Sequence, residues 1–378
     1  MGSIELDHIR TSLDNAHSPE EVFGTLVGTR AERIDAARKV FHQIAKIAHP
    51  DLYQGTVDFD RANAIFKKLA HLWELAQARI ENGTYGTTRE TNTFTPFSIR
   101  TPKYQYHIEK FLAQGDLCNL YLGISSSMDK QKRYLLKFPI KPEDNDLVLN
   151  EARILAHLKK GTEYEKLHHF VSQLVDTFSY QERVSGIIRQ VNVLSYQKGW
   201  YSLKEVREAY PHGIDARDVA WIWRRLLVAL GFAHANHVIH GAVLPPHVLI
   251  SPDQHGVMLI DWSYAVLQPA TTGEYISAIS STYREWYPEE VFAKEEPTPG
   301  LDISMAALCM VYLLNGNPHK RMPPETLPWQ LQNYLKGCML PRPQQRPQEV
   351  SILLDDFDAL IERLWGPRRF HQFVMPER

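Results

Sequence analysis

The sequence predicts a multidomain α and α+β protein, in which an all-α helical hairpin precedes a larger mixed domain. Three observations predict this arrangement. The chain has 378 residues, more than the roughly 150 of one typical domain. Residues 19–80 carry apolar side chains at helical spacing. Beyond about residue 104 the pattern changes to short β-like runs and then, after Ser202, to long helical periods. The second domain should therefore have a strand-rich front and a helical back.

The composition is that of a globular protein, with 44% hydrophobic and 23% charged residues. A net charge of -2 provides no surface-wide basic field, so we expect neither nucleic acid nor a membrane as a partner. The three cysteines, Cys118, Cys309 and Cys338, lack zinc-ligand spacing and do not indicate a disulfide framework. The N-terminal residues are polar and acidic, unlike an export signal, and no apolar run is long enough to span a bilayer. We therefore expect a cytoplasmic protein.

Two antiparallel amphipathic helices are expected between residues 19 and 80. The apolar positions that predict them are Ile34, Ala37, Phe41, Ile44 and Ala48 in the first helix, and Phe66, Leu69, Ala70, Trp73 and Ile80 in the second. Pro50 should end the first helix, because its ring disfavours helical geometry at the preceding residue. The tripeptide His49-Pro50-Asp51 therefore lies in the loop between the helices.

This stretch resembles the J domain of DnaJ-type co-chaperones. The resemblance rests on the tripeptide, on the basic helix before it and on the VFGTL segment upstream, which matches the family pattern only approximately. It implies that a DnaK-type chaperone is the partner and that its ATPase is stimulated through His49, Pro50 and Asp51. The basic residues Arg38, Lys39 and Lys46 would dock on an acidic patch of that chaperone, where charge speeds encounter.

In the second domain, Lys137 lies within the apolar run RYLLKFPI, and Glu151 lies in the helical segment that follows. A lysine inside an apolar strand is expected to be buried, and a buried ammonium group needs a partner such as Glu151. Downstream, the segments HVIHGAVLPPHVLI, GVMLIDWSYA, REWYPEEVF, GLDISMAALCMVYLLNG and LPRPQQRPQEV appear in the order of a protein-kinase C-lobe. The sequence from 105 to 366 thus resembles a bilobal protein kinase.

The resemblance implies roles for several residues. Gly115 in FLAQGDLCNLYLG would remain from the Gly-rich loop, and Lys137, Glu151 and Asp261 would bind a nucleotide, with Asp261 as the candidate Mg²⁺ ligand. Four residues would be structural: His240, Glu289, Asp302 and Arg346. Among them, Glu289 and Arg346 would form a buried ion pair. No cofactor is fixed by the sequence, and ATP with Mg²⁺ is the one that this set would hold.

The centre of the kinase pattern is altered, which resembles a pseudokinase. Ala242 cannot accept a hydroxyl proton, and Leu244 cannot stabilise a transferring phosphoryl group. His247 replaces the metal-binding Asn, although Mg²⁺ prefers oxygen ligands. Leu135 adds bulk to the adenine slot. The full set of degenerate positions is Ala113, Cys118, Leu135, Gly241, Ala242, Leu244 and His247.

Three functions remain open at this point. The first is a J-domain co-chaperone or adaptor, whose catalytically impaired kinase-like domain acts as a docking or nucleotide-sensing module for an unknown protein client. The second is an atypical ATP-dependent phosphoryl or nucleotidyl transferase that uses Lys137, Glu151 and Asp261. In the third, both modules are structural parts of a larger assembly. The losses in the catalytic loop favour the first and argue against an enzyme.

The expected organisation has five parts. They are an N-terminal extension (1–18), a J domain (19–82), a Thr-rich linker (83–104), a kinase-like domain (105–366, with an N-lobe over 105–197 and a C-lobe over 198–366) and a C-terminal tail (367–378).

Overall fold

The computed structural model describes residues 6–7, 9–10, 12–13, 16, 18–81, 85, 94–127, 130–182 and 186–376. The chain divides into two compact units, residues 1–93 and residues 94–378. Each has its own hydrophobic core, and each is described by itself. Among the described residues, none of the helices has both the length and the apolar character needed to cross a membrane.

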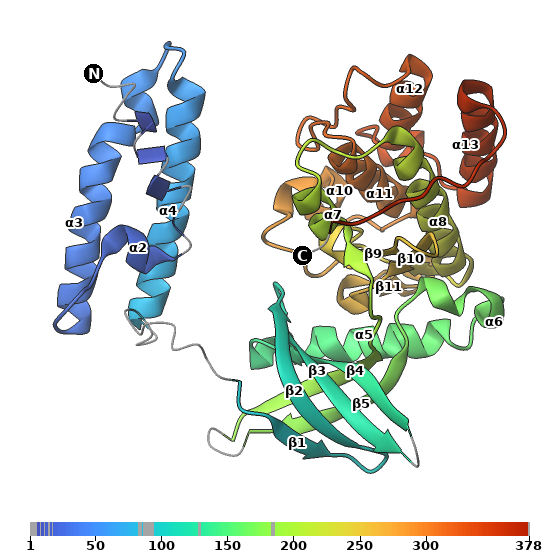
Figure 1. Ribbon diagram of the computed structural model, residues 1–378, viewed down its shortest axis with the longest axis horizontal. Coiled ribbons are helices and arrows are strands. Elements are labelled where there is room, and N and C mark those ends of the chain that lie inside the picture. The colour runs from blue at the N-terminus through green and yellow to red at the C-terminus, as the bar shows by residue number, and fades with distance from the viewer. Residues whose placement is uncertain are drawn as a thin grey trace. The chain divides into compact units, whose positions relative to one another are not determined.

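The first unit is a helical hairpin made of α3 (Arg30–Ala48) and α4 (Phe59–Glu81), with the short α2 (Pro19–Phe23) packed beside them (Figure 1). Helix α3 begins with a capping box, in which the Thr29 side chain and Glu32 satisfy each other's backbone N–H groups. It ends at Ala48, before Pro50, as the proline predicts. The two helices bury facing apolar side chains, among them Ala37, Ala48, Leu69 and Ile80.

This hairpin core extends beyond the residues expected to form it. Leu6 and Leu13, in the predicted extension, are buried in the same core. Tyr85, in the predicted linker, is also buried, and its hydroxyl donates a hydrogen bond to the Gly24 carbonyl at 2.9 Å. Isolated apolar residues at these positions carry no periodic signal in the sequence.

The second unit begins with an antiparallel sheet of six strands in the order β1-β2-β3-β4-β6-β5 (Figure 1). Helix α5 (Asn145–Leu158) lies against this sheet. The strands are β1 (Phe97–Arg100), β2 (Gln105–Gln114), β3 (Cys118–Ser127), β4 (Lys130–Pro139), β5 (Leu174–Gln181) and β6 (Ile188–Ser195). Strand β1 corrects the predicted linker, which was expected to reach residue 104. Its four residues alternate in burial but are embedded in Thr- and Pro-rich sequence that masks the pattern.

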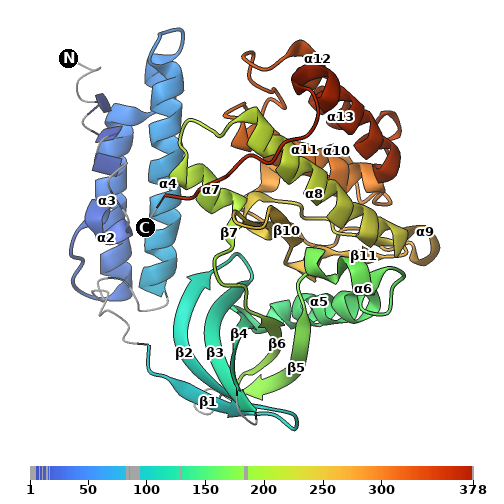
Figure 2. The ribbon, with the colours of Figure 1, turned by 45° about the vertical axis from the view of Figure 1, so that its right-hand side comes forward.

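The helical lobe follows, and its core is built around α8 and α11 (Figure 2). Nearly every side chain of α11 is buried, as expected of a helix that is apolar all round. The lobe comprises α7 (Leu203–Ala209), α8 (Ala216–Ala235), α9 (Pro269–Thr272), α10 (Glu289–Phe292), α11 (Pro299–Leu313), α12 (Trp329–Cys338), α13 (Val350–Trp365), and the short strands β7 (Tyr201–Ser202), β8 (Val238–Ile239), β9 (Val248–Ser251), β10 (Gly256–Leu259) and β11 (Val266–Leu267).

The C-terminal tail, to which the sequence assigns no motif, packs on this lobe. Phe373 is 5% exposed, and the His371 ring lies 2.7 Å from the Asp218 carboxylate. The Phe370 ring stacks on His255 with centroids 4.4 Å apart. The described part of the tail is therefore an integral layer of the helical lobe.

Candidate functional site

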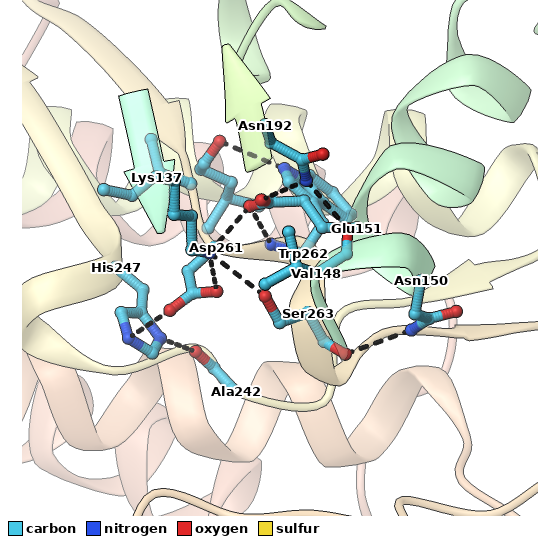
Figure 3. Close-up of polar contacts among 12 residues, drawn as sticks. Lys137, Val148, Asn150, Glu151, Asn192, Ala242, His247, Asp261, Trp262 and Ser263 are labelled. Atoms are coloured by element: carbon cyan, nitrogen blue, oxygen red, sulfur yellow. Dashed lines mark hydrogen bonds and ion pairs between the residues drawn. The ribbon is translucent and has the colours of Figure 1, made fainter. Parts of the chain in front are cut away.

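The Lys137–Glu151 pair that the sequence predicts is present between β4 and α5 (Figure 3). The Lys137 Nζ lies 3.0 Å from Glu151 Oε1, and both side chains are buried. The second carboxylate oxygen of Glu151 accepts a hydrogen bond from Asn192 Nδ2 at 3.0 Å, and that amide also donates to the Val148 carbonyl. Asn192 on β6 thus fixes the orientation of the carboxylate.

Asp261 and Ser263 complete the partners of the lysine. Asp261 follows β10 in the left-handed backbone region, with φ of 61°, and its Oδ1 lies 2.5 Å from Lys137 Nζ. Ser263 Oγ lies 3.0 Å from the same nitrogen. An ammonium group has three hydrogens to donate, and here three acceptors surround it. A phosphate group that binds Lys137 must therefore displace one of them.

The ionisation of this cluster follows from its charges. Burial alone would lower the pKa of Lys137, but the carboxylates of Asp261 and Glu151 outweigh burial and raise the pKa well above its usual value. Burial alone would raise the pKa of Asp261, but the charges of Lys137 and His247 lower it strongly. Both groups are therefore charged across the physiological pH range.

The positions that correspond to the kinase catalytic loop hold no side chain that could act as a general base. Ala242 and Leu244 are both fully buried, so their side chains contribute only apolar contacts. Gly241 has φ of 73°, where any other residue is strained, and a Cβ on it would lie 2.4 Å from the Ile276 Cδ1 and 3.0 Å from the Tyr264 carbonyl oxygen, so the family's arginine is disfavoured here. Asp302 fixes the backbone of this loop: its carboxylate accepts hydrogen bonds from the N–H groups of His240 and Gly241, each at 2.8 Å.

The kinase resemblance implies a Mg²⁺ ion at Asp261, but the side chains around Asp261 are unsuitable ligands for it. Mg²⁺ takes oxygen ligands in octahedral geometry, and the candidate ligand Asp261 supplies such an oxygen. The side chain facing it is the imidazole of His247, whose Nε2 lies 3.3 Å from Asp261 Oδ2. The described residues contain no group of three or more His, Cys, Asp or Glu that could hold a metal ion. The pair therefore fits Mg²⁺ poorly.

The turn that corresponds to the Gly-rich loop is hydrogen-bonded to the segment that follows Asp261. Gly115 donates its N–H to the Cys118 carbonyl at 2.8 Å, while Asp116 accepts hydrogen bonds from the hydroxyls of Ser280 and Thr282, the latter at 3.0 Å. Leu117 in the turn, together with Leu135 at the predicted adenine position, packs against the helical-lobe core. The turn and the segment between Asp261 and Pro288 are thus joined.

The remaining degenerate positions of the turn are inert. Ala113 is exposed. Cys118 is buried, and burial raises the pKa of its thiol to about 12, although the nearby Lys137 opposes this. A thiol with so high a pKa carries almost no thiolate near neutral pH and is a poor nucleophile.

One predicted ion pair is wrong by one residue. Arg346 binds the carboxylate of Glu290 through both terminal nitrogens, whereas Glu289 is exposed. Both acids lie in the first turn of α10, whose two leading residues differ by about 100° in direction. Only the second of them faces the core. Arg346 also donates to the carbonyls of Leu340 and Pro341, so it secures the segment before α13.

In the hairpin unit, the tripeptide lies at the start of the loop between α3 and α4. The His49 ring packs edge-on to Phe66, with centroids 4.9 Å apart, and its Nδ1 accepts a hydrogen bond from the Asp51 N–H at 3.3 Å. The hydrogen of the neutral ring is therefore on Nε2. Asp51 is exposed, and so are the three predicted docking residues of α3, which are Arg38, Lys39 and Lys46.

Comparisons with known proteins relate the chain to protein kinases. No protein-family model matches it. It is 25% identical over 178 residues to cyclin-dependent kinase-like 2 of Rattus norvegicus (44% of this chain, 34% of the relative). It is 21% identical over 299 residues to the serine/threonine-protein kinase pak-1 of Caenorhabditis elegans (75% of this chain, 47% of the relative). The chain thus spans less than half the length of these two curated relatives.

Two solved structures are similar in fold. The BubR1 kinase domain superposes with a TM-score of 0.54 at 14% identity, covering 71% of this chain and 83% of that one. Vaccinia related kinase 3 superposes with a TM-score of 0.53 at 18% identity, covering 71% and 90%. The chain therefore contains a bilobal protein-kinase-like fold. The comparisons do not support the predicted J domain over residues 19–82, which stays a prediction.

Proposed function

We propose that the protein is a J-domain co-chaperone or adaptor that stimulates the ATPase of a DnaK-type chaperone, and that its kinase-like domain binds a client or senses nucleotide without transferring phosphate. The observation that carries the proposal is the fully buried Ala242 at the position of the catalytic carboxylate. General base catalysis needs a titratable group within hydrogen-bond reach of the substrate proton, and a methyl group provides none.

The co-chaperone half of the proposal is supported by the layout of the hairpin. His49, Pro50 and Asp51 lie at the end of two packed helices, so the loop is held in a defined conformation. The exposed basic residues Arg38, Lys39 and Lys46 lie on the helix that leads to it. Such a charged helix accelerates encounter with an acidic surface.

Stimulation of chaperone ATP hydrolysis tests this half directly. The full-length protein is added to a DnaK-type chaperone, and single-turnover ATP hydrolysis is measured for the wild type and for His49→Gln. We expect His49→Gln to abolish stimulation. His42→Gln, which changes an exposed histidine on the same helix, should retain it, and so should Lys137→Ala in the other unit. Equal loss in all three variants would contradict the modular assignment.

The nucleotide-sensing half is supported by the retained cluster of Lys137, Glu151 and Asp261, whose ammonium group would bind the phosphates of ATP. Calorimetric titration with ATP, with and without Mg²⁺, tests it. Lys137→Ala should remove the binding heat. The absence of heat from the wild type at millimolar ATP would leave client docking as the role of the domain.

The same cluster favours a second candidate, an atypical phosphoryl or nucleotidyl transferase. Lys137 and Asp261 form a direct ion pair at 2.5 Å, and a polyphosphate that displaces this contact would meet both groups. Incubation with labelled ATP and a divalent ion should then label a protein or nucleotide acceptor, and Asp261→Ala should remove the label. A label that persists in that variant would exclude this function for the cluster.

A further inference from the structure

The last described residues, 367–376, lie on the helical lobe as an extended segment. Figure 2 shows this tail crossing α8 toward α7 without forming a helix or a strand. Phe373 is buried and Met375 packs partly against the core, whereas Val374 between them is 58% exposed. Such alternation is the pattern of an extended peptide laid on a surface. Among the described residues, no backbone–backbone hydrogen bond joins the tail to the rest of the lobe, so side chains hold it in place.

The first of these attachments is an aromatic socket. The centroid of the Phe373 ring lies 5.8 Å from that of Tyr210 and 6.2 Å from that of Trp221. Tyr210 follows the last residue of α7, and Trp221 lies in the second turn of α8. The Tyr210 hydroxyl also donates a hydrogen bond to the Val374 carbonyl. A buried aromatic side chain in a fitted pocket is the usual anchor of a bound peptide or protein.

The second attachment is electrostatic. Asp218 on α8 is 5% exposed, and His371 Nδ1 lies 2.7 Å from its Oδ1. Arg368 contacts Asp358 of α13 in the same way. The basic groups of the tail thus face acidic groups of the lobe. A buried carboxylate that loses its basic partner is costly, so this surface favours a ligand with a basic residue.

The tail does not fill the surface on which it lies. A cavity of about 390 Å³ lies beside it, and tail residues 370 and 372–375 line one side of this cavity. The lobe lines the other side with Gly199, Tyr201, Pro252 and Asp253. This volume is in the range of small-ligand pockets, so a segment with larger side chains than those of the tail has room here. We call the cavity, the aromatic socket and Asp218 together the tail groove.

We propose that the tail groove is a docking site for an extended segment of a protein partner that carries a basic residue two positions before an aromatic one, and that residues 371–375 are the chain's own competitor for it. The proposal deepens the client-docking role and rests on it for the identity of the partner. A competitor within the same chain lowers the apparent affinity of the partner, because only the fraction of molecules with a free groove binds it. A partner that also fills the cavity overcomes this competition.

The experiment titrates full-length protein into a fluorescent peptide with the sequence of residues 368–376 and records its anisotropy. Phe373→Ala releases the tail of the protein and should bind the peptide at least about 10-fold more tightly than the wild type does. Adding Asp218→Asn to that variant should weaken binding about 10-fold or more, as expected for a lost hydrogen bond to a charged group. A matched control is Asp356→Asn, which changes an exposed acid on α13 and should leave binding intact.

A second peptide tests the recognition chemistry apart from the sequence of the tail. It keeps only an arginine and, two positions later, a phenylalanine in a Gly-Ser background. It should bind the Phe373→Ala protein and be displaced by the tail peptide, whereas a version with alanine in place of its phenylalanine should not bind. Binding that ignores this alanine would contradict an aromatic anchor.

Three other results would overturn the proposal. The first is equal affinity of the tail peptide for the wild type and for folded Phe373→Ala, and the second is no effect of Asp218→Asn. The third is a wild-type dimer, detected by light scattering, that Phe373→Ala dissociates, because the groove would then hold the tail of a second copy. Should Phe373→Ala not fold, His371→Ala decides the question, since it removes only the electrostatic attachment, and a peptide affinity no higher than that of the wild type refutes the competition. Chaperone and ATP are both absent, so failure here is distinct from failure of ATPase stimulation or of nucleotide sensing.

Discussion

Acidification should destabilise the kinase-like domain through His240, a fully buried residue. Its ring accepts a hydrogen bond at Nδ1 from the Ala242 N–H at 3.3 Å, and its Nε2 lies 3.1 Å from the Ile260 carbonyl, to which it donates. One ring nitrogen thus accepts a hydrogen bond and the other donates one, which only the neutral form of the ring can do. Burial lowers the pKa of His240 to about 4, despite the opposing charge of Asp302.

The size and sign of the effect follow from this pKa. In the unfolded chain the imidazole has a pKa of about 6.5, so between about pH 6.5 and pH 4 the unfolded state binds a proton that the folded state does not. Stability therefore falls as the pH falls through this window. At about 1.4 kcal/mol per pKa unit, the neutral His240 contributes about 3 kcal/mol above pH 6.5, of which about 2 kcal/mol is lost at about pH 5.

Urea unfolding followed by tryptophan fluorescence measures this loss, since seven of the eight tryptophans lie in residues 94–378. The wild type is compared with His240→Gln, whose amide retains a donor and an acceptor but does not titrate. The free energy of unfolding should fall by about 2 kcal/mol more in the wild type than in the variant between about pH 7 and pH 5. Equal losses in the two proteins would refute the reasoning, because the loss would then come from groups that both proteins share.

Three further substitutions test the packing of this domain. Glu290→Gln should destabilise it by about 3–5 kcal/mol because it leaves the Arg346 charge buried and unpaired, while Glu289→Gln should change stability by less than about 0.5 kcal/mol; thermal denaturation compares them. Gly241→Ala should cost more than the approximately 1 kcal/mol expected of Gly273→Ala, because both glycines have positive φ but only the first would bring its Cβ against a neighbouring side chain. Truncation of the buried Phe373 to alanine should cost about 3–5 kcal/mol in urea unfolding, and a cost under about 1 kcal/mol would show that the tail is not an integral layer.

The parts of the site that the sequence predicted are those with a strong energetic requirement. Lys137 lies in an apolar strand, and an ammonium group there must find a carboxylate. The sequence pattern therefore predicts an acidic partner, and the kinase resemblance indicates Glu151 as that partner. The helical hairpin and the end of α3 before Pro50 follow similarly from periodicity and from proline sterics.

The missed parts depend on contacts between residues far apart in the chain. Asn192 and Ser263 are single polar residues, and nothing local distinguishes a serine that bonds a lysine from one that faces water. The wrong choice of Glu289 over Glu290 reflects the orientation of a four-residue helix, which has no periodicity to measure. The buried Phe373 was missed because an isolated aromatic residue in a basic tail carries no repeating pattern.

The hydrogen bonds that Asp116 accepts from Ser280 and Thr282 have a kinetic consequence. A ligand that binds between this turn and the segment from Asp261 to Pro288 must wait until the two separate. Association that requires such an opening is slower than the roughly 10⁵–10⁷ M⁻¹s⁻¹ usual for docking onto a preformed surface. Reclosure over the bound ligand retards its escape as well. A ligand held there would then stay bound for longer than its affinity alone implies.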